Sequence, residues 1–274
     1  MTTSKRGSWE LPISESELAR LTEEMDQAHQ ETLPVMAASA RDLTQEIHDL
    51  RATEPDTGPR QRVHVARRRF LIGAGASAAA LALAACGGDS DGSTGTPSKS
   101  PSGSGGTYTG DLKVVALAAA LENQAVGAYQ AALKAAKDGK LGKVPPVFAT
   151  FAQTAMDQHK DHADAWNAIL ASADKPKITG TPLSNHDDVT KALGKVKDVP
   201  GVAKLALRLE DQATQTYVFA ASNVKSKGGI ETAATIAPVE AMHSAILHYV
   251  LGQYPVPDDF IGTDKAASPS LLTV

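Results

Sequence analysis

Apolar residues recur at intervals of three and four along most of the chain, which is the spacing of amphipathic helices. In the C-terminal part, glycines and prolines divide this pattern into segments of helical length. The segments predict long helices over residues 111–140, 145–173, 200–227 and 230–251, with a short helix over 187–196 and an extended tail over 254–274. We therefore expect an all-α protein with an antiparallel four-helix bundle over residues 111–253.

A similar pattern occupies residues 14–51, ahead of the predicted bundle. Its apolar stripe consists of Leu18, Leu21, Met25, His29 and Leu33. The stripe predicts one amphipathic helix, or two helices divided at Pro34. Two interpretations of residues 1–66 are open. Either they form a cytoplasmic extension that is discarded with an export signal, or translation starts near Val63 or Val65 and most of the segment is never made.

Residues 67–86 have the features of such a signal. Arg67-Arg68-Arg69-Phe70-Leu71 precedes an apolar run that is too short, and too rich in alanine and glycine, to predict a membrane span. The run ends in Leu83-Ala84-Ala85-Cys86. The first segment resembles a twin-arginine export signal, and the second resembles a bacterial lipobox, in which the cysteine is lipidated. The structural alternative is a buried alanine-rich helix with an incidental cysteine.

This resemblance implies two partners, the twin-arginine export machinery and the membrane, with a lipid anchor at Cys86 on the outer face of the cytoplasmic membrane. Residues 87–110 are rich in glycine, serine and threonine and predict a flexible linker between anchor and bundle. The formal net charge of −4 provides no basic surface for nucleic acid. Because Cys86 is the single cysteine, no disulfide can form within the chain.

The candidate functional residues begin with a short sequence motif that occurs twice. Residues 121–125 read Leu-Glu-Asn-Gln-Ala, and residues 209–213 read Leu-Glu-Asp-Gln-Ala. Each glutamate, Glu122 or Glu210, belongs to an apolar helix stripe, although a buried carboxylate is costly unless it is paired or binds a metal. A tyrosine, Tyr129 or Tyr217, follows seven residues later on the same helix face. Core packing explains these tyrosines, and their hydroxyls can also support the carboxylates.

A pair of polar residues follows each copy of the motif. His159 and His162 follow the first copy, and Glu240 and His243 follow the second. Residues at i and i+3 share a helix face, so each pair can point at one site among apolar neighbours. Together with the two repeated glutamates, these four residues are candidate metal ligands. The alternative is that they are hydrogen-bonded polar pairs inside the core.

This order of ligands resembles the ferritin-like superfamily, and specifically an exported ferritin-like domain lipoprotein. The resemblance implies a ferritin-like bundle with an internal two-fold repeat and a di-iron or di-manganese centre. In that family each half supplies a lone glutamate and a Glu-x-x-His pair. His159 stands where the family pattern expects a glutamate. With His159 the ligands carry a charge of −3 instead of −4, so a single metal ion, zinc or copper becomes more competitive.

Two functions follow as hypotheses. The first is a lipid-anchored extracytoplasmic protein that binds or oxidises iron, as one or two ions, or another transition metal, which includes a metal-dependent oxidoreductase. The second is a metal-free helical bundle that acts as a binding or scaffolding lipoprotein. The sequence identifies no protein partner for either function.

Overall fold

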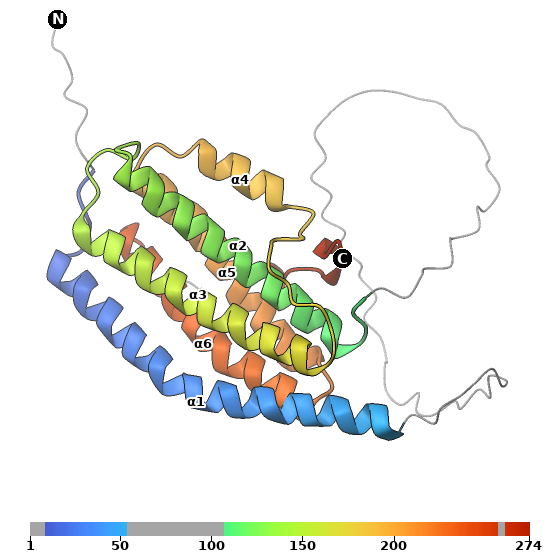
Figure 1. Ribbon diagram of the computed structural model, residues 1–274. Helices are drawn as coiled ribbons and strands as arrows, with labels where there is room; N and C mark the ends of the chain where they lie inside the picture. Colours follow the sequence, from blue (N-terminus) through green and yellow to red (C-terminus); the bar gives the residue numbers. More distant parts are fainter. Residues whose placement is uncertain (1–8, 54–106, 257–260) are drawn as a thin grey trace, which may run out of the picture. The chain divides into compact units, whose positions relative to one another are not determined.

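The computed structural model describes residues 9–53, 107–256 and 261–274 (Figure 1). Within these ranges the chain is helical and forms no strand, and one isolated antiparallel bridge joins Leu183 to Leu272. The elements are α1 (Glu15–Thr53), α2 (Asp111–Lys137), α3 (Pro146–Ser172), α4 (His186–Gly194), α5 (Val199–Asn223), α6 (Lys227–Val250) and the 3-10 turn η1 (Pro269–Leu271). The predicted fold class, an all-α helical bundle, is confirmed. Among the described helices, none has the length and apolar composition needed to cross a membrane.

The helices of the bundle lie where the apolar periodicity predicts them, with ends that differ by a few residues. The start of α5 is fixed by Asp198, whose carboxylate accepts the backbone N–H of Gly201 at 2.8 Å. Its end comes earlier than expected, because Val224 adopts an extended backbone conformation. The two residues that follow Val224, Lys225 and Ser226, donate their backbone N–H groups to the carboxylate of Asp111 at the start of α2. This contact ties the α5–α6 connection to α2.

The helix α1 continues without interruption through Pro34, so the chain does not divide there. A proline cannot donate a hydrogen bond to the carbonyl four residues earlier, which belongs to Gln30. Pro34 and Gln30 are both exposed, so water can take the place of the missing donor. Met25 and Leu43, on either side of the proline, are buried at 2% and 0% exposure. Packing therefore anchors both halves of the helix on the bundle, and the helix bends near its middle (Figure 1).

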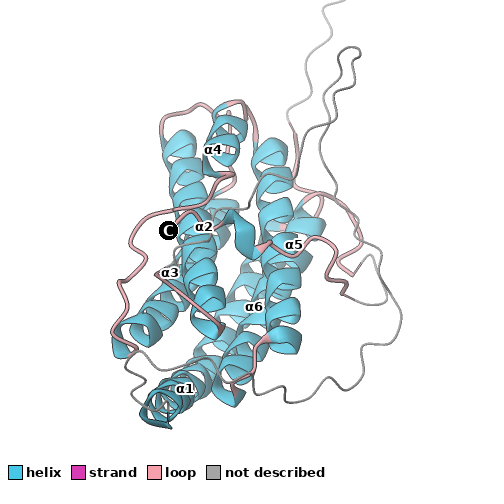
Figure 2. Cartoon of the chain, turned by 90° about the vertical axis from the view of Figure 1, so that its right-hand side faces the viewer, coloured by secondary structure: helices cyan, strands magenta, loops and turns pink. Residues whose placement is uncertain are grey.

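The bundle consists of two helical hairpins, with α2 packed against α3 and α5 packed against α6 (Figure 2). These hairpins are the two halves of the internal repeat. The apolar core is split into two clusters along the bundle axis. One contains Trp166, Leu170 and Ile236, and the other contains Phe151 and Leu247. Between them lies a layer of buried glutamates and histidines, to which each of the four bundle helices contributes.

The long connection from α3 to α5 and the C-terminal tail lie against the bundle. Asn167 on α3 holds the connection through two hydrogen bonds with the backbone of Ile178, at 2.7 and 2.9 Å. Thr216 on α5 holds the tail by accepting the backbone N–H of Ala267 at 2.8 Å. The signal-like residues 67–86, including Cys86, and most of the linker lie outside the described residues.

Candidate metal centre

The six candidate ligands meet in the polar layer. They are Glu122 on α2, His159 and His162 on α3, Glu210 on α5, and Glu240 and His243 on α6. None is more than 2% exposed. Each belongs to the inward stripe of its helix, and the i, i+3 spacing lets α3 and α6 supply two side chains each. The sequence pattern therefore placed these side chains on the inward faces, and the packing of the hairpins brings them together.

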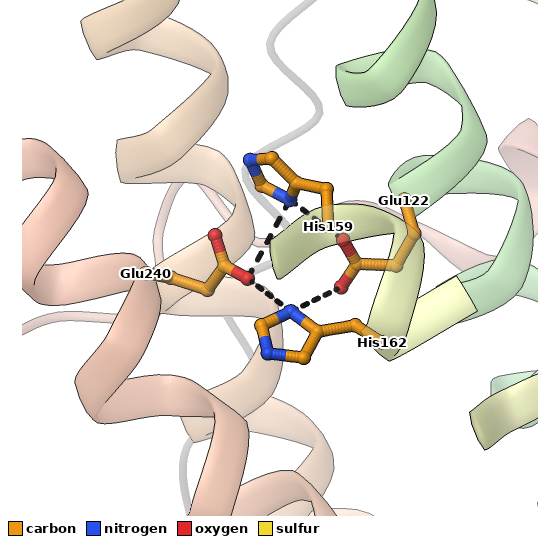
Figure 3. Close-up of side chains that lie close together, drawn as sticks. All are labelled: Glu122, His159, His162 and Glu240. Carbon is orange, nitrogen blue, oxygen red and sulfur yellow. Dashed lines mark hydrogen bonds and ion pairs between the residues drawn. The ribbon is translucent and has the colours of Figure 1, made fainter. Parts of the chain in front are cut away.

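The ligands form two overlapping groups. One consists of Glu122, His159, His162 and Glu240, and the other of His159, Glu210, Glu240 and His243. Within each group, one ligand atom from every residue lies within 4.8 Å of the others. Figure 3 shows the first group, in which side chains from three helices converge. Because two residues belong to both groups, the arrangement has the form of a binuclear centre.

His159 and Glu240 are the shared residues. His159 directs Nδ1 to Glu122 Oε2, at 2.7 Å, and Nε2 to Glu210 Oε1, at 3.2 Å. Glu240 directs Oε1 to His162 Nδ1, at 2.9 Å, and Oε2 to His243 Nδ1, at 3.3 Å. Each shared residue thus offers one atom to each group. The imidazole of His159 occupies the place opposite Glu240, where the family pattern expects a second carboxylate.

The two tyrosines bind carboxylates across the repeat. Tyr129 on α2 donates its hydroxyl hydrogen to Glu210 Oε1 on α5, at 2.5 Å. Tyr217 on α5 donates to Glu122 Oε1 on α2, and accepts a hydrogen bond from Trp166 Nε1 at 3.0 Å. Burial, and then the charge of the partner glutamate, raises the pKa of both tyrosines well above its usual range. The hydroxyls therefore stay protonated and fix the orientation of Glu122 and Glu210.

Glu122 and Glu210 are held as carboxylates. Burial by itself raises the pKa of Glu122, but the hydrogen bond and charge of His159 and the nearby charge of His162 outweigh it and lower the pKa to about 2. Burial opposes ionisation of Glu210 in the same way, and the charges of His159 and His243 lower its pKa well below the usual range. The positive partners of these carboxylates are therefore the imidazoles.

The histidines take up protons in return. Burial by itself lowers the pKa of each imidazole, but the surrounding glutamates reverse this effect. The pKa of His162 is raised to about 9, that of His159 is raised well above its usual value, and that of His243 is also raised. Without a cation, the raised pKa values favour protonated imidazoles beside the carboxylates of the same layer. A bound metal ion would replace these protons, because it binds neutral imidazole.

The donor atoms fit a transition metal. The combination of carboxylate oxygen and imidazole nitrogen suits iron, manganese, zinc or copper better than calcium or magnesium, which prefer oxygen alone. His162 Nδ1 and Glu240 Oε1 lie 2.9 Å apart, yet neither finds a properly aligned hydrogen-bond partner within the described residues. Atoms that approach closely without sharing a hydrogen bond are arranged as ligands of a common cation would be. These residues would hold the metal.

The sequence pattern did not identify two buried side chains that lie near the ligands, Gln158 and His29, as site residues. Gln158 is 2% exposed and accepts a hydrogen bond from His243 Nε2 at 2.8 Å. His29, on α1, is 0% exposed, and its ring lies edge-on to that of His162 with centroids 5.1 Å apart. Burial, and then the charge of His162, lowers the pKa of His29. The signal for His29 was its place in the apolar stripe of residues 14–51.

Comparison with known proteins agrees with the fold. Searches of curated proteins and of solved structures find no significant match. A family model described as a ferritin-like domain matches residues 92–253, a span that contains all six candidate ligands and both tyrosines. The chain therefore belongs to the ferritin-like domain family.

Proposed function

We propose that the chain is an exported, lipid-anchored ferritin-like protein that binds one or two transition-metal ions in its buried centre, and holds or oxidises iron or a related metal there. The observation that carries the metal proposal is the sharing of His159 and Glu240 between two four-residue groups. A structural ion pair needs two partners, whereas this layer collects three carboxylates and three imidazoles at one level of the core.

The ligand charge bears on the identity of the metal. With neutral imidazoles, the three carboxylates supply a charge of −3, which compensates one or two divalent ions better than two ferric ions. His159 also adds nitrogen to the donor set, which favours zinc or copper relative to an all-carboxylate bridge. We therefore expect the centre to accept several divalent transition metals. Its preference would follow both intrinsic affinity and metal supply.

Elemental analysis of protein exported by its native host is the direct test. We expect bound iron, manganese, zinc or copper, and a rise in the thermal midpoint when the same metal is returned to stripped protein. Replacing both repeated glutamates (Glu122→Gln with Glu210→Gln) should abolish binding. The matched control is Glu23→Gln at an exposed position on α1. Protein that contains no metal, and that none of the four metals stabilises, would refute the proposed function.

A second function is favoured by the electrostatics of the layer. Three carboxylates and three protonated imidazoles neutralise one another, so the core can also be satisfied as a metal-free binding or scaffolding bundle. This alternative predicts protein without metal in the host and a thermal midpoint that none of the four metals shifts. Elemental analysis thus separates the two functions. The stability of the glutamate variants without metal does not separate them, because the paired glutamates support the core in both.

The export and anchoring proposals are supported by residues 67–86. Replacing Arg67 and Arg68 by lysine should stop twin-arginine export, and Cys86→Ser should prevent lipid attachment. Cell fractionation and mass spectrometry of the mature N-terminus measure both effects. Wild-type protein that remains in the cytoplasm with an intact N-terminus would contradict the proposed localisation without affecting the metal proposal.

A further inference from the structure

The helix α1 closes a groove of the bundle. In Figures 1 and 2 it runs along the side of the bundle formed by α3 and α6, and it packs against both. α3 and α6 approach each other much less closely than either approaches α1. These are also the two helices that carry four of the six candidate ligands. α1 therefore lies between them at the side of the metal centre.

The buried face of α1 follows the layers of the bundle. Leu18 and Met25 join the apolar cluster on one side of the polar layer, and Met36 and Leu43 join the cluster on the other side. His29 comes between these pairs, at the level of the glutamates and histidines of the other helices. Helix α1 therefore shows the same pattern as the four bundle helices, with two apolar sections separated by a polar one.

Two contacts lead from α1 to metal-binding histidines. The first is the ring of His29, which lies against His162 and whose Nε2 is 3.3 Å from Asp161 Oδ2. The second runs through Gln158, whose Nε2 donates to Asp26 Oδ1 at 3.0 Å and whose Oε1 accepts from His243 Nε2 at 2.8 Å. Because Nε2 of His243 points to Gln158, Nδ1 is the ring nitrogen that faces the glutamates.

The C-terminal part of α1 fits closely against the start of α6. The Glu46 carboxylate accepts the backbone N–H groups of Lys227 and Gly228, at 2.9 and 3.2 Å, at the start of α6. A side chain at Gly228 would collide with the backbone nitrogen of Leu43 and the carbonyl oxygen of Ser39. Glycine at this position lets the two backbones approach closely.

We propose that α1 is a structural part of the metal centre: it closes the groove between α3 and α6, and its residues His29 and Asp26 position His162 and His243 as metal ligands. This inference rests on the proposed metal-binding function and extends it, and it does not rest on the proposed export, which would separate α1 from the bundle. It assigns a role in the centre to a segment that lies upstream of the signal-like sequence. Partners that orient ligating histidines typically contribute 10- to 100-fold to metal affinity.

The test uses the full chain and cobalt(II), whose absorption spectrum reports the ligand geometry. We expect His29→Ala to weaken cobalt(II) binding about 10- to 100-fold and to change the absorption bands. His29→Phe keeps a ring against His162 and should restore most of the affinity. The matched control, His48→Ala, alters an exposed histidine on the same helix and should bind as wild type.

Two further substitutions test the other contacts. Asp26→Leu removes the acceptor for Gln158 and should weaken binding, whereas Asp26→Asn retains an acceptor oxygen and should preserve it. Gly228→Ala should push α1 away from α6 without altering a ligand, and Gly127→Ala, where an added carbon meets nothing within 4 Å, is its control. Circular dichroism identifies any variant that fails to fold, and the Asp26 and His29 series then decides.

The outcomes separate the two proposals. If wild-type protein binds cobalt(II) and the His29→Ala and Asp26→Leu variants bind with the same affinity and spectrum, the role of α1 is refuted and the metal-binding function stands. If wild-type protein binds no metal ion, the proposed function fails and this inference fails with it.

Discussion

Metal binding to the buried layer should release protons, so its affinity should depend steeply on pH. In the metal-free protein the pKa of His162 is raised to about 9, and those of His159 and His243 are raised as well. Metal ions bind neutral imidazole, so each protonated histidine must lose its proton on ligation. Affinity should therefore increase as the pH rises toward the pKa of each histidine in the metal-free state.

The magnitude follows from His162. At pH 7 its imidazole lies two pH units below a pKa of about 9. Each unit corresponds to about 1.4 kcal/mol, so deprotonating this one residue at pH 7 costs about 3 kcal/mol and weakens binding about 100-fold relative to high pH. Between pH 6 and 8 the logarithm of the association constant should rise by at least about one per pH unit, and by up to about three if all three histidines ligate.

Zinc affinity measured in chelator-buffered solution at pH 6, 7 and 8 gives this slope, after correction for the chelator. Calorimetry in buffers of different ionisation enthalpy counts the protons directly. The His162→Gln variant should reduce the slope by about one, while His48→Gln, an exposed control on α1, should leave it unchanged. A wild-type affinity that is constant over this range, with no protons released, would show that the histidines are neutral in the metal-free protein and would refute the reasoning.

Three further predictions concern stability. Tyr217→Phe leaves the Glu122 carboxylate and Trp166 Nε1 without their buried partner and should lower the free energy of unfolding by about 1–3 kcal/mol in urea denaturation, whereas the exposed control Tyr249→Phe should not. Gly127→Ala should raise the free energy of unfolding by about 0.5–1 kcal/mol, because the added methyl group meets nothing within 4 Å in the middle of α2; a decrease would show that this helix is strained. The metal-free protein should become less stable as the pH rises from 6.5 to about 9, because the stabilisation from the raised pKa of His162 is fully present below the unfolded-state value and is lost as that residue deprotonates in the folded state. Urea denaturation at pH 6 and pH 9 measures this change, and equal stability at the two values would contradict it.

The helices and the inward side chains were predictable because both depend on local periodicity. Glu122 and Glu210 lie in apolar stripes, and the i, i+3 spacing of His159 and His162 fixes their common face, whatever the bundle does. The crossing of the tyrosine contacts was not predictable in this way. Tyr129 shares a helix with Glu122 but binds Glu210, because the partner is chosen by which helices face one another in the folded chain.

The environment of Gln158 shows where a single-stripe analysis fails. This side chain points toward α1 as well as toward His243 of the opposite hairpin, and the sequence does not show that α3 has a second buried face. The second face exists because α1 packs there, so Gln158 is buried between Asp26 and His243. A helix that contacts neighbours on two sides carries a wider buried stripe than the pattern of one interface predicts.

The position of α1 in the chain conflicts with its position in the fold. Residues 9–53 belong to the same compact unit as the bundle, although the signal-like residues 67–86 lie between the two in sequence. On the proposed export route, the segment upstream of the signal remains on the cytoplasmic side while the bundle crosses the membrane. Helix α1 cannot stay in the groove between α3 and α6 of a bundle that has crossed. A chain that is exported must therefore lose the contact with α1 and expose the side of the metal centre that α1 covers. A chain that keeps α1 in place keeps that side closed.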